Sequence, residues 1–416
     1  MRYPYDPELA AAVVMMPEVD ISDVPAARAA QAEQLADAVS AADEAGVDVE
    51  EVRWPGPEGA PDVLVRIYRP RCVRGPLPAI LSLHGGGYVV GSPDVDHAWN
   101  LMLSRELPAL VVSVDYRLAP EHPFPAGLED CYAVLCRLAK DATELGIRAD
   151  RIAVGGDSAG AGLAAGLALL ARDRGGPDIC FQLLMSPELD DRLATPSALE
   201  FTDTPVWNRR NARLSWDAYL GPGVPGSAGV PPYAAPARAG SAELAGAALR
   251  YGPAAGGPAG ASGPAAGQEP PGTAGPAAGE ERPDAAGRPG TAGLPGGLSG
   301  GLPGEGFLSG EGRLSGTGAL AGTGGLPGAE GLPGAGGLPG TVGLAGLPPA
   351  YVSVMQFDPL RDEGVDYARA LLAAGVPAEL HLFPGTFHGA VMVTHSDVAQ
   401  RITAGAVGAL RRVLAR

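Results

Sequence analysis

The stretch that most constrains the fold is Gly156-Asp-Ser-Ala-Gly160, which lies between two apolar segments. Residues 152–154 are typical of a buried strand, and residues 161–171 are small and apolar at helical spacing. A serine at such a strand-to-helix turn exposes its hydroxyl at the sheet edge, and small neighbours let strand and helix approach closely. Because the chain has 62 glycines, a chance match is an open alternative. The flanking strand and helix favour Ser158 as a nucleophile.

Apolar runs alternate with helical patterns along most of the chain. Strands are expected at residues 50–54, 62–68, 79–83, 109–114, 152–154, 179–185, 350–355 and 378–383. Helices are expected at residues 26–44, 94–107, 127–145, 161–171, 204–220 and 365–374. The alternating residues 62–68 indicate an antiparallel edge, and the rest predicts an α/β fold with a mostly parallel sheet covered by helices on both faces. A site is expected at the carboxyl ends of its strands.

A second motif, His84-Gly-Gly-Gly87, directly follows the strand at 79–83. A developing oxyanion requires converging backbone N–H donors, and side chains there would block the substrate. Gly86 and Gly87 can supply two such donors, and Ala159, which follows the serine, can supply a third. A flexible turn is the alternative for three consecutive glycines. Its position at a strand end favours an oxyanion hole.

Two further residues complete a catalytic set. Asp358 follows the strand at 350–355, and His388 follows the strand at 378–383. In this interpretation Ser158 attacks, His388 accepts its proton and later returns it to the leaving group, and Asp358 orients the imidazole. Other histidines and acids are poorer candidates by position, namely His84, His97, His122, His381, His395, Asp157, Asp362, Glu363 and Asp366.

Four motifs together resemble the hormone-sensitive-lipase-like branch of the α/β-hydrolases: residues 84–87, 115–126, 156–160 and 358–364. Ala161 stands where that branch often has a third glycine. The resemblance implies an α/β-hydrolase fold and a serine carboxylesterase of short- to medium-chain acyl esters. It also implies supporting roles for His84, Gly85, Gly156, Asp157 and Gly160, and a mainly helical cap from residues 1–48 and the helix at 204–220. No metal or cofactor is expected.

Residues 239–343 differ from the rest, since glycine, proline and alanine dominate and large side chains are few. Such a segment buries too little apolar surface to offset its chain entropy, so a disordered insert is expected. Glycine recurs at every third position from 325 to 348, which leaves a short collagen-like triple helix as an alternative. The catalytic domain is expected to comprise residues 49–238 and 344–416.

Charge and targeting signals narrow the class of partner. A formal net charge of −17 disfavours nucleic acid and anionic membranes. The four cysteines show no metal-ligand spacing, and no secretory signal or membrane-spanning run is recognisable, so a cytoplasmic protein acting on a small-molecule ester is expected. The oligomeric state is left open. The functional alternatives are a non-catalytic ligand-binding relative, an amide or lactone hydrolase with the same triad, and an interaction protein that oligomerises through the collagen-like tract.

Overall fold

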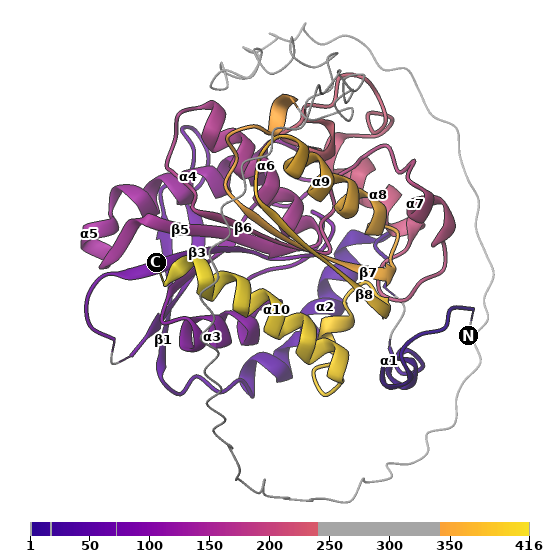
Figure 1. Ribbon diagram of the computed structural model, residues 1–416, viewed down its shortest axis with the longest axis horizontal. Coiled ribbons are helices and arrows are strands. Elements are labelled where there is room, and N and C mark those ends of the chain that lie inside the picture. The colour runs from indigo at the N-terminus through magenta and orange to yellow at the C-terminus, as the bar shows by residue number, and fades with distance from the viewer. Residues whose placement is uncertain (1, 17–18, 72, 240–341, 416) are drawn as a thin grey trace, which may run out of the picture. The chain divides into compact units, whose positions relative to one another are not determined.

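The computed structural model describes residues 2–16, 19–71, 73–239 and 342–415. In this part of the chain eight strands form one sheet in the order β1-β2-β4-β3-β5-β6-β7-β8 (Figure 1). β1 pairs antiparallel with β2, and β2 with β4, whereas every pair from β4 to β8 is parallel. This confirms the expected mostly parallel sheet with an antiparallel edge. The strands are β1 Val47–Trp54, β2 Val63–Pro70, β3 Leu77–Leu83, β4 Leu110–Asp115, β5 Ile147–Asp157, β6 Phe181–Met185, β7 Ala350–Phe357 and β8 Ala378–Phe387.

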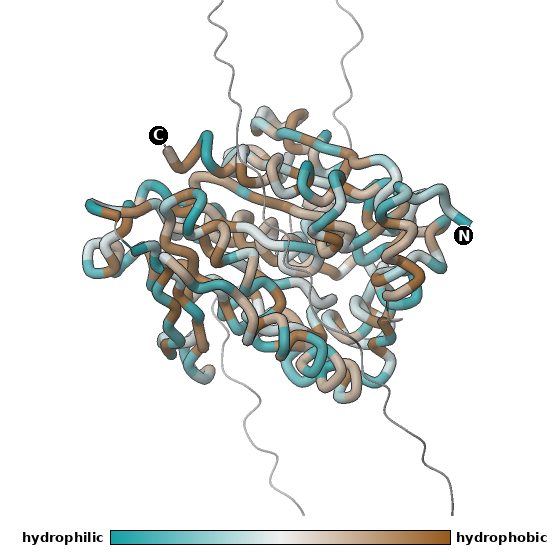
Figure 2. Tube along the Cα trace, turned by 90° about the horizontal axis from the view of Figure 1, so that it is seen from below, coloured by the Kyte–Doolittle hydropathy of each residue, from teal (hydrophilic) through white to brown (hydrophobic). Residues whose placement is uncertain are grey.

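Helices cover both faces of the sheet, as expected. α4 (Ala126–Lys140), α6 (Ala159–Asp173) and α9 (Arg361–Ala373) share one hydrophobic core with one face of the strands. α3 (His97–Glu106) and α10 (Asp397–Leu414) share a second core with the other face (Figure 1). Along the outer helices hydrophilic and hydrophobic residues alternate, as Figure 2 shows, because only one side of each helix faces the sheet.

The N-terminal residues lie beside α8 (Arg209–Leu220). The Asn211 side chain donates a hydrogen bond of 2.8 Å to the Val19 carbonyl. Arg28 on α2 (Val24–Ser40) donates to the carbonyls of Val89 and Ala119, at 2.7 and 2.9 Å. The two segments expected to form a cap therefore contact each other and the loop that follows β3. Among the described residues, the other α-helices are α1 (Pro7–Val13), α5 (Ala142–Leu145) and α7 (Pro196–Glu200), and short 3-10 helices lie at Pro236–Arg238, Val342–Leu344 and Ala390–Met392.

Several helix predictions require correction. The helix expected at 26–44 spans 24–40; Val24 and Ala27 are partly buried against the core, and no residue of the helix is fully buried. The helix expected at 127–145 is interrupted at Asp141 and continues as α5, which ends at the left-handed Gly146. The helix expected at 204–220 begins at Arg209, because the Asn208 side chain caps it by accepting from the Asn211 N–H. α10 was not predicted from the sequence.

The Gly/Pro/Ala-rich insert lies outside the described residues, apart from its ends at Ala239, Val342 and Gly343. Both flanking segments are held at the C-terminal end of α6. The Tyr233 hydroxyl donates to Asp173 at 2.9 Å, and Arg172 donates to the Gly343 carbonyl at 2.6 Å. Two adjacent residues of one helix therefore anchor the chain before and after the insert.

None of the helices in the described ranges is long and apolar enough to cross a membrane. Cys131, Cys136 and Cys180 are free thiols, and Cys72 is among the undescribed residues.

Candidate active site

Ser158 occupies the turn between β5 and α6 with φ of 56°, a region that L-residues other than glycine rarely adopt. Its N–H donates to the Met185 carbonyl at 2.8 Å, and its own carbonyl accepts from the Glu188 N–H at 3.1 Å. A side chain at Gly156 or Gly160 would overlap the Leu83 carbonyl. The small flanking residues thus allow the close approach of strand and helix that the sequence predicts.

His388 and Asp358 converge on this serine. His388 Nε2 lies 3.0 Å from Ser158 Oγ, and His388 Nδ1 lies 2.8 Å from Asp358 Oδ2. The three side chains are at most 5% exposed, so water does not compete strongly for these hydrogen bonds. The arrangement allows Nε2 to accept a proton from the hydroxyl while the carboxylate holds the other ring nitrogen.

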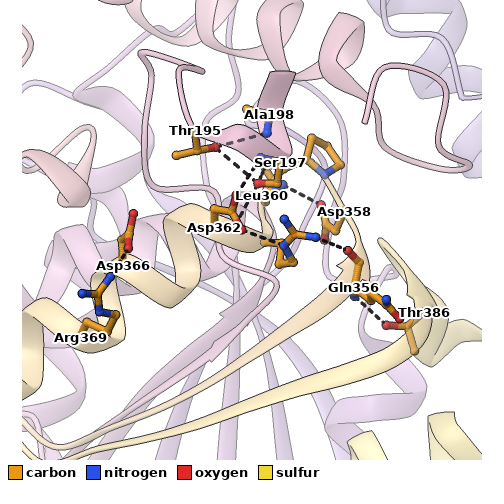
Figure 3. Close-up of polar contacts among 12 residues, drawn as sticks. Thr195, Ser197, Ala198, Gln356, Asp358, Leu360, Asp362, Asp366, Arg369 and Thr386 are labelled. Atoms are coloured by element: carbon orange, nitrogen blue, oxygen red, sulfur yellow. Dashed lines mark hydrogen bonds and ion pairs between the residues drawn. The ribbon is translucent and has the colours of Figure 1, made fainter. Parts of the chain in front are cut away.

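Hydrogen bonds fix the segments that carry Asp358 and His388. Asp358 Oδ1 accepts from the Leu360 N–H at 2.9 Å (Figure 3). This leaves Oδ2 for His388. Gln356 on β7 donates its N–H to the Thr386 hydroxyl of β8 at 3.1 Å, close to His388 in the chain. The two strands therefore hold Asp358 and His388 in register.

The beginning of α9 is joined to α7. Ser197 and Asp362 exchange two hydrogen bonds of 2.8 and 3.0 Å, and the Ser197 hydroxyl also donates to the Pro359 carbonyl at 3.0 Å (Figure 3). Glu363 Oε1 accepts from the N–H groups of Leu189 and Asp190. Two of the competing acids thus bind the backbone and side chains of the β6–α8 segment. Another, Asp366, pairs with Arg369 at the surface.

Residues 84–87 lie directly beside the serine turn. The His84 ring stacks on Tyr116 with 4.2 Å between centroids, and the Tyr116 hydroxyl donates to the His84 carbonyl at 2.7 Å. Burial lowers the pKa of His84 to about 4, so its neutral ring serves as packing beside the Gly85 backbone. A side chain at Gly85 would press on the Asp157 carbonyl, 3.2 Å away. Tyr116, which lies in the motif at residues 115–126, thus supports the glycine loop.

The three expected oxyanion donors remain available. Gly86 and Gly87 have positive φ values of 126° and 55°, which glycine adopts without strain. Nowhere in the described ranges does a protein atom accept a hydrogen bond from the N–H of Gly86, Gly87 or Ala159. Ala159 is the first residue of α6, where helix N–H groups lack intrahelical acceptors. Such free donors beside a nucleophile suit a developing negative charge.

The charges around the imidazole favour its protonated form. Burial alone would lower the pKa of His388, but the adjacent Asp358 carboxylate, with smaller contributions from Asp157 and Glu188, raises it to about 9. Burial raises the pKa of Asp157 to about 6, and the Asp358 charge contributes in the same direction. An imidazolium formed during a reaction would therefore be stabilised.

Trp207 forms a wall of the site. Its indole lies 6.0 Å from the His388 ring between centroids, and a side chain at Gly87 would overlap its six-membered ring. The residue is buried, and it lies just before α8. The aromatic residues near 204–220 were predicted only as part of a cap, and the structure places Trp207 against both the base and the glycine loop.

No individual role was predicted from the sequence for three residues here: Tyr116, which lies inside the motif at 115–126, Glu188 and Ser215. Glu188 follows β6 at the carboxyl end of a strand adjacent to β5, and that position was the available signal. Its carboxylate is fully buried, and Ser215 on α8 lies 3.2 Å from Oε1. Ser215 had no sequence signal, because its contact with the glycine loop joins residues 128 positions apart.

Known proteins resemble this chain in sequence. A family described as having the alpha/beta hydrolase fold matches residues 80–250 and 335–392. The carboxylesterase NlhH of Mycobacterium tuberculosis is 45% identical over 168 residues, which is 40% of this chain and 53% of that protein. The esterase LipI of Mycobacterium tuberculosis is 31% identical over 338 residues, 81% of this chain and 72% of that protein. The chain thus spans about half the length of the first of these relatives.

Solved structures of esterases are also similar to this chain. A bacterial heroin esterase is 37% identical, with a TM-score of 0.73, and the match covers 99% of this chain and 98% of that one. The esterase LipW of Mycobacterium marinum is 31% identical with a TM-score of 0.68, over 99% of this chain and 96% of that one.

Proposed function

Because this chain belongs to the α/β-hydrolase fold family, we propose that it is a serine carboxylesterase whose triad is Ser158, Asp358 and His388. The observation that carries the proposal is the continuous chain of hydrogen bonds from Ser158 Oγ through the His388 ring to Asp358. The esterases among the similar proteins support an ester as the substrate.

In the proposed mechanism Ser158 Oγ attacks the ester carbonyl while His388 Nε2 takes its proton. The N–H groups of Gly86, Gly87 and Ala159 bind the oxyanion, and His388 returns the proton to the departing alcohol. His388 then takes a proton from water, which attacks the acyl-enzyme, and returns that proton to Ser158 Oγ as the carboxylic acid leaves. Asp358 keeps the imidazole oriented and stabilises its charge.

We further propose that short to medium acyl chains are preferred. The indole of Trp207 occupies space beside both His388 and Gly87, which limits the room next to the reacting carbon. The proposal also includes a cap made by the N-terminal residues and α8, which would exclude water from this space.

The test is a series of p-nitrophenyl esters from acetate to palmitate, with wild type and Ser158→Ala measured in parallel. We expect hydrolysis that depends on Ser158 and a larger kcat/KM for butyrate than for palmitate. An equally active Ser158→Ala protein would refute the triad. A preference for palmitate would refute only the acyl-chain proposal, and faster cleavage of the matching p-nitroanilides would indicate an amidase.

A further inference from the structure

The hydroxyl of Ser215, on α8, lies within hydrogen-bond distance of two oxygen atoms, and each of them can accept a hydrogen bond. Its Oγ lies 2.8 Å from the carbonyl of Gly87 and 3.2 Å from Oε1 of Glu188. Gly87 belongs to the loop that supplies oxyanion donors, and Glu188 follows β6 immediately behind the nucleophile. The Glu188 carboxyl, the Ser215 hydroxyl and the Gly87 carbonyl thus form a row of polar contacts that leads from a buried side chain to the glycine loop.

The number of protons shared by Glu188, Ser215 and the Gly87 carbonyl depends on whether Glu188 is protonated. A serine hydroxyl carries one proton, a carbonyl only accepts, and an ionised carboxylate also only accepts. With Glu188 ionised, Ser215 can satisfy only one of its two neighbours. With Glu188 protonated, the carboxyl donates to Ser215 Oγ and Ser215 donates to the Gly87 carbonyl, so that both contacts are hydrogen bonds.

The surroundings of Glu188 favour the protonated form. The side chain is fully buried, and Oε2 has no hydrogen-bond partner among the described residues. Burial raises the pKa of Glu188 to about 8, with Ser215 and His388 acting against the increase and Asp358 adding to it. The other ionisable groups facing it are Tyr88, whose hydroxyl donates to the Glu188 backbone carbonyl at 3.0 Å, Tyr219 and Glu363.

We propose that Glu188 is a positioning residue whose protonated carboxyl commits the Ser215 hydroxyl to the Gly87 carbonyl and thereby holds the oxyanion loop in place. Ionisation of Glu188 draws the Ser215 proton toward the carboxylate and releases Gly87. The inference rests on the proposed esterase function, because an oxyanion loop matters only if an oxyanion forms. It predicts that ionisation of Glu188, acting on the glycine loop through Ser215, lowers kcat at alkaline pH and so opposes the rise that deprotonation of His388 causes.

The test is a double-mutant cycle of wild type, Glu188→Gln, Ser215→Ala and the double variant. For each protein kcat toward p-nitrophenyl butyrate is measured at pH 7.0 and 9.5. The ratio of kcat at pH 9.5 to kcat at pH 7.0 is then compared among the four proteins. Glutamine retains a donor for Ser215 but cannot ionise. We expect the ratio to be at least about fivefold higher in Glu188→Gln than in wild type, and this difference to vanish when Ser215 is alanine.

The double-mutant cycle distinguishes an effect of Glu188 that acts through Ser215 from a direct effect of the Glu188 charge on His388. The Glu188 carboxylate also acts through space on His388, and that effect persists without Ser215. A difference that survives in the Ser215→Ala background, or no difference in either background, would overturn the proposal. If the wild-type protein hydrolyses no ester, the proposed function fails instead.

A second pair of variants guards against misfolding. Ser215→Thr keeps the hydroxyl and Ser215→Ala removes it, both with native Glu188, and near-ultraviolet circular dichroism at the two pH values checks the fold. The threonine variant is expected to retain the wild-type ratio, and the alanine variant is expected to have a higher ratio, as Glu188→Gln does. Equal ratios in these two proteins would also contradict the proposal.

Discussion

His388 Nε2 lies 3.0 Å from Ser158 Oγ although the two residues are 230 positions apart in the chain. The parallel sheet makes this possible, because β5 and β8 both end at the same edge and deliver the two residues there. Asp358, at the end of β7 between them in the sheet, completes the set. The following predictions test what each part contributes.

Asp358→Asn should lower kcat by about 10⁴, because an amide no longer holds His388 in the orientation and tautomer that accept the serine proton. The pH profile should change as well. Only neutral His388 acts as a base, so activity rises with pH through its pKa of about 9, and loss of the Asp358 charge moves this limb toward lower pH. The profile of kcat/KM reports this pKa in the free enzyme. A limb that stays in place would contradict the assigned partner.

Gly87→Ala should reduce kcat by about 100-fold or more, the size of effect expected when an oxyanion donor is displaced. The new methyl group would overlap the Trp207 ring at a φ of 55°. Gly146→Ala is the matched control, since it has a φ of 65° and nothing within 4 Å of the added carbon. If both variants lose activity equally, backbone strain alone explains the result and the oxyanion role of Gly87 fails.

The folded protein should lose stability as pH rises from about 5.5 to 8.5. His388 and Glu188 have folded-state pKa values of about 9 and 8, above their ordinary values of 6.5 and 4.5. The folded state therefore binds more protons in this window, so the free energy of unfolding falls as pH increases. In Glu188→Gln the drop in Tm across the window should be smaller by about 5 °C. Thermal melts at pH 5.5, 7.0 and 8.5 measure it, and an identical drop in both proteins would contradict the assignment to Glu188.

The Gly/Pro/Ala-rich insert should be dispensable for catalysis. Asp173 and Arg172 anchor Tyr233 and Gly343 on either side of it, and Arg238 is buried against Asp191 with a bond of 2.8 Å. Replacement of residues 240–341 by a Gly/Ser linker of about ten residues leaves these anchors intact. Activity is expected within about tenfold of wild type, a barrier change of about 1.4 kcal/mol. An insoluble or inactive product would show that the insert is part of the enzyme.

The sequence predicted those parts of the fold whose signal is local. Apolar runs located the strands, and the residues just past three of them, Ser158, Asp358 and His388, could be placed at one edge because parallel strands end together. Gly86 and Gly87 were recognisable because oxyanion loops require glycine. Each of these inferences needed only a few consecutive residues.

The unpredicted features depend on contacts between distant segments. The link from Glu188 through Ser215 to Gly87 joins three elements, and neither a serine on a helix nor a glutamate after a strand reveals its partner. Arg28 attaches α2 to the backbone carbonyls of Val89 and Ala119, and hydropathy does not show such a contact. The start of α8 depended on the Asn208 cap, a signal that was present but not used.

The most direct test of the central claim is covalent labelling with a fluorophosphonate followed by peptide mass spectrometry. We expect one equivalent of label on Ser158, no label on Ser158→Ala, and a fall in ester hydrolysis by about five orders of magnitude in that variant. Ser227→Ala, which changes an exposed serine, is the control and should label and hydrolyse as wild type does. Label on a different serine, or a Ser158→Ala protein that still hydrolyses p-nitrophenyl butyrate at near the wild-type rate, would contradict the account.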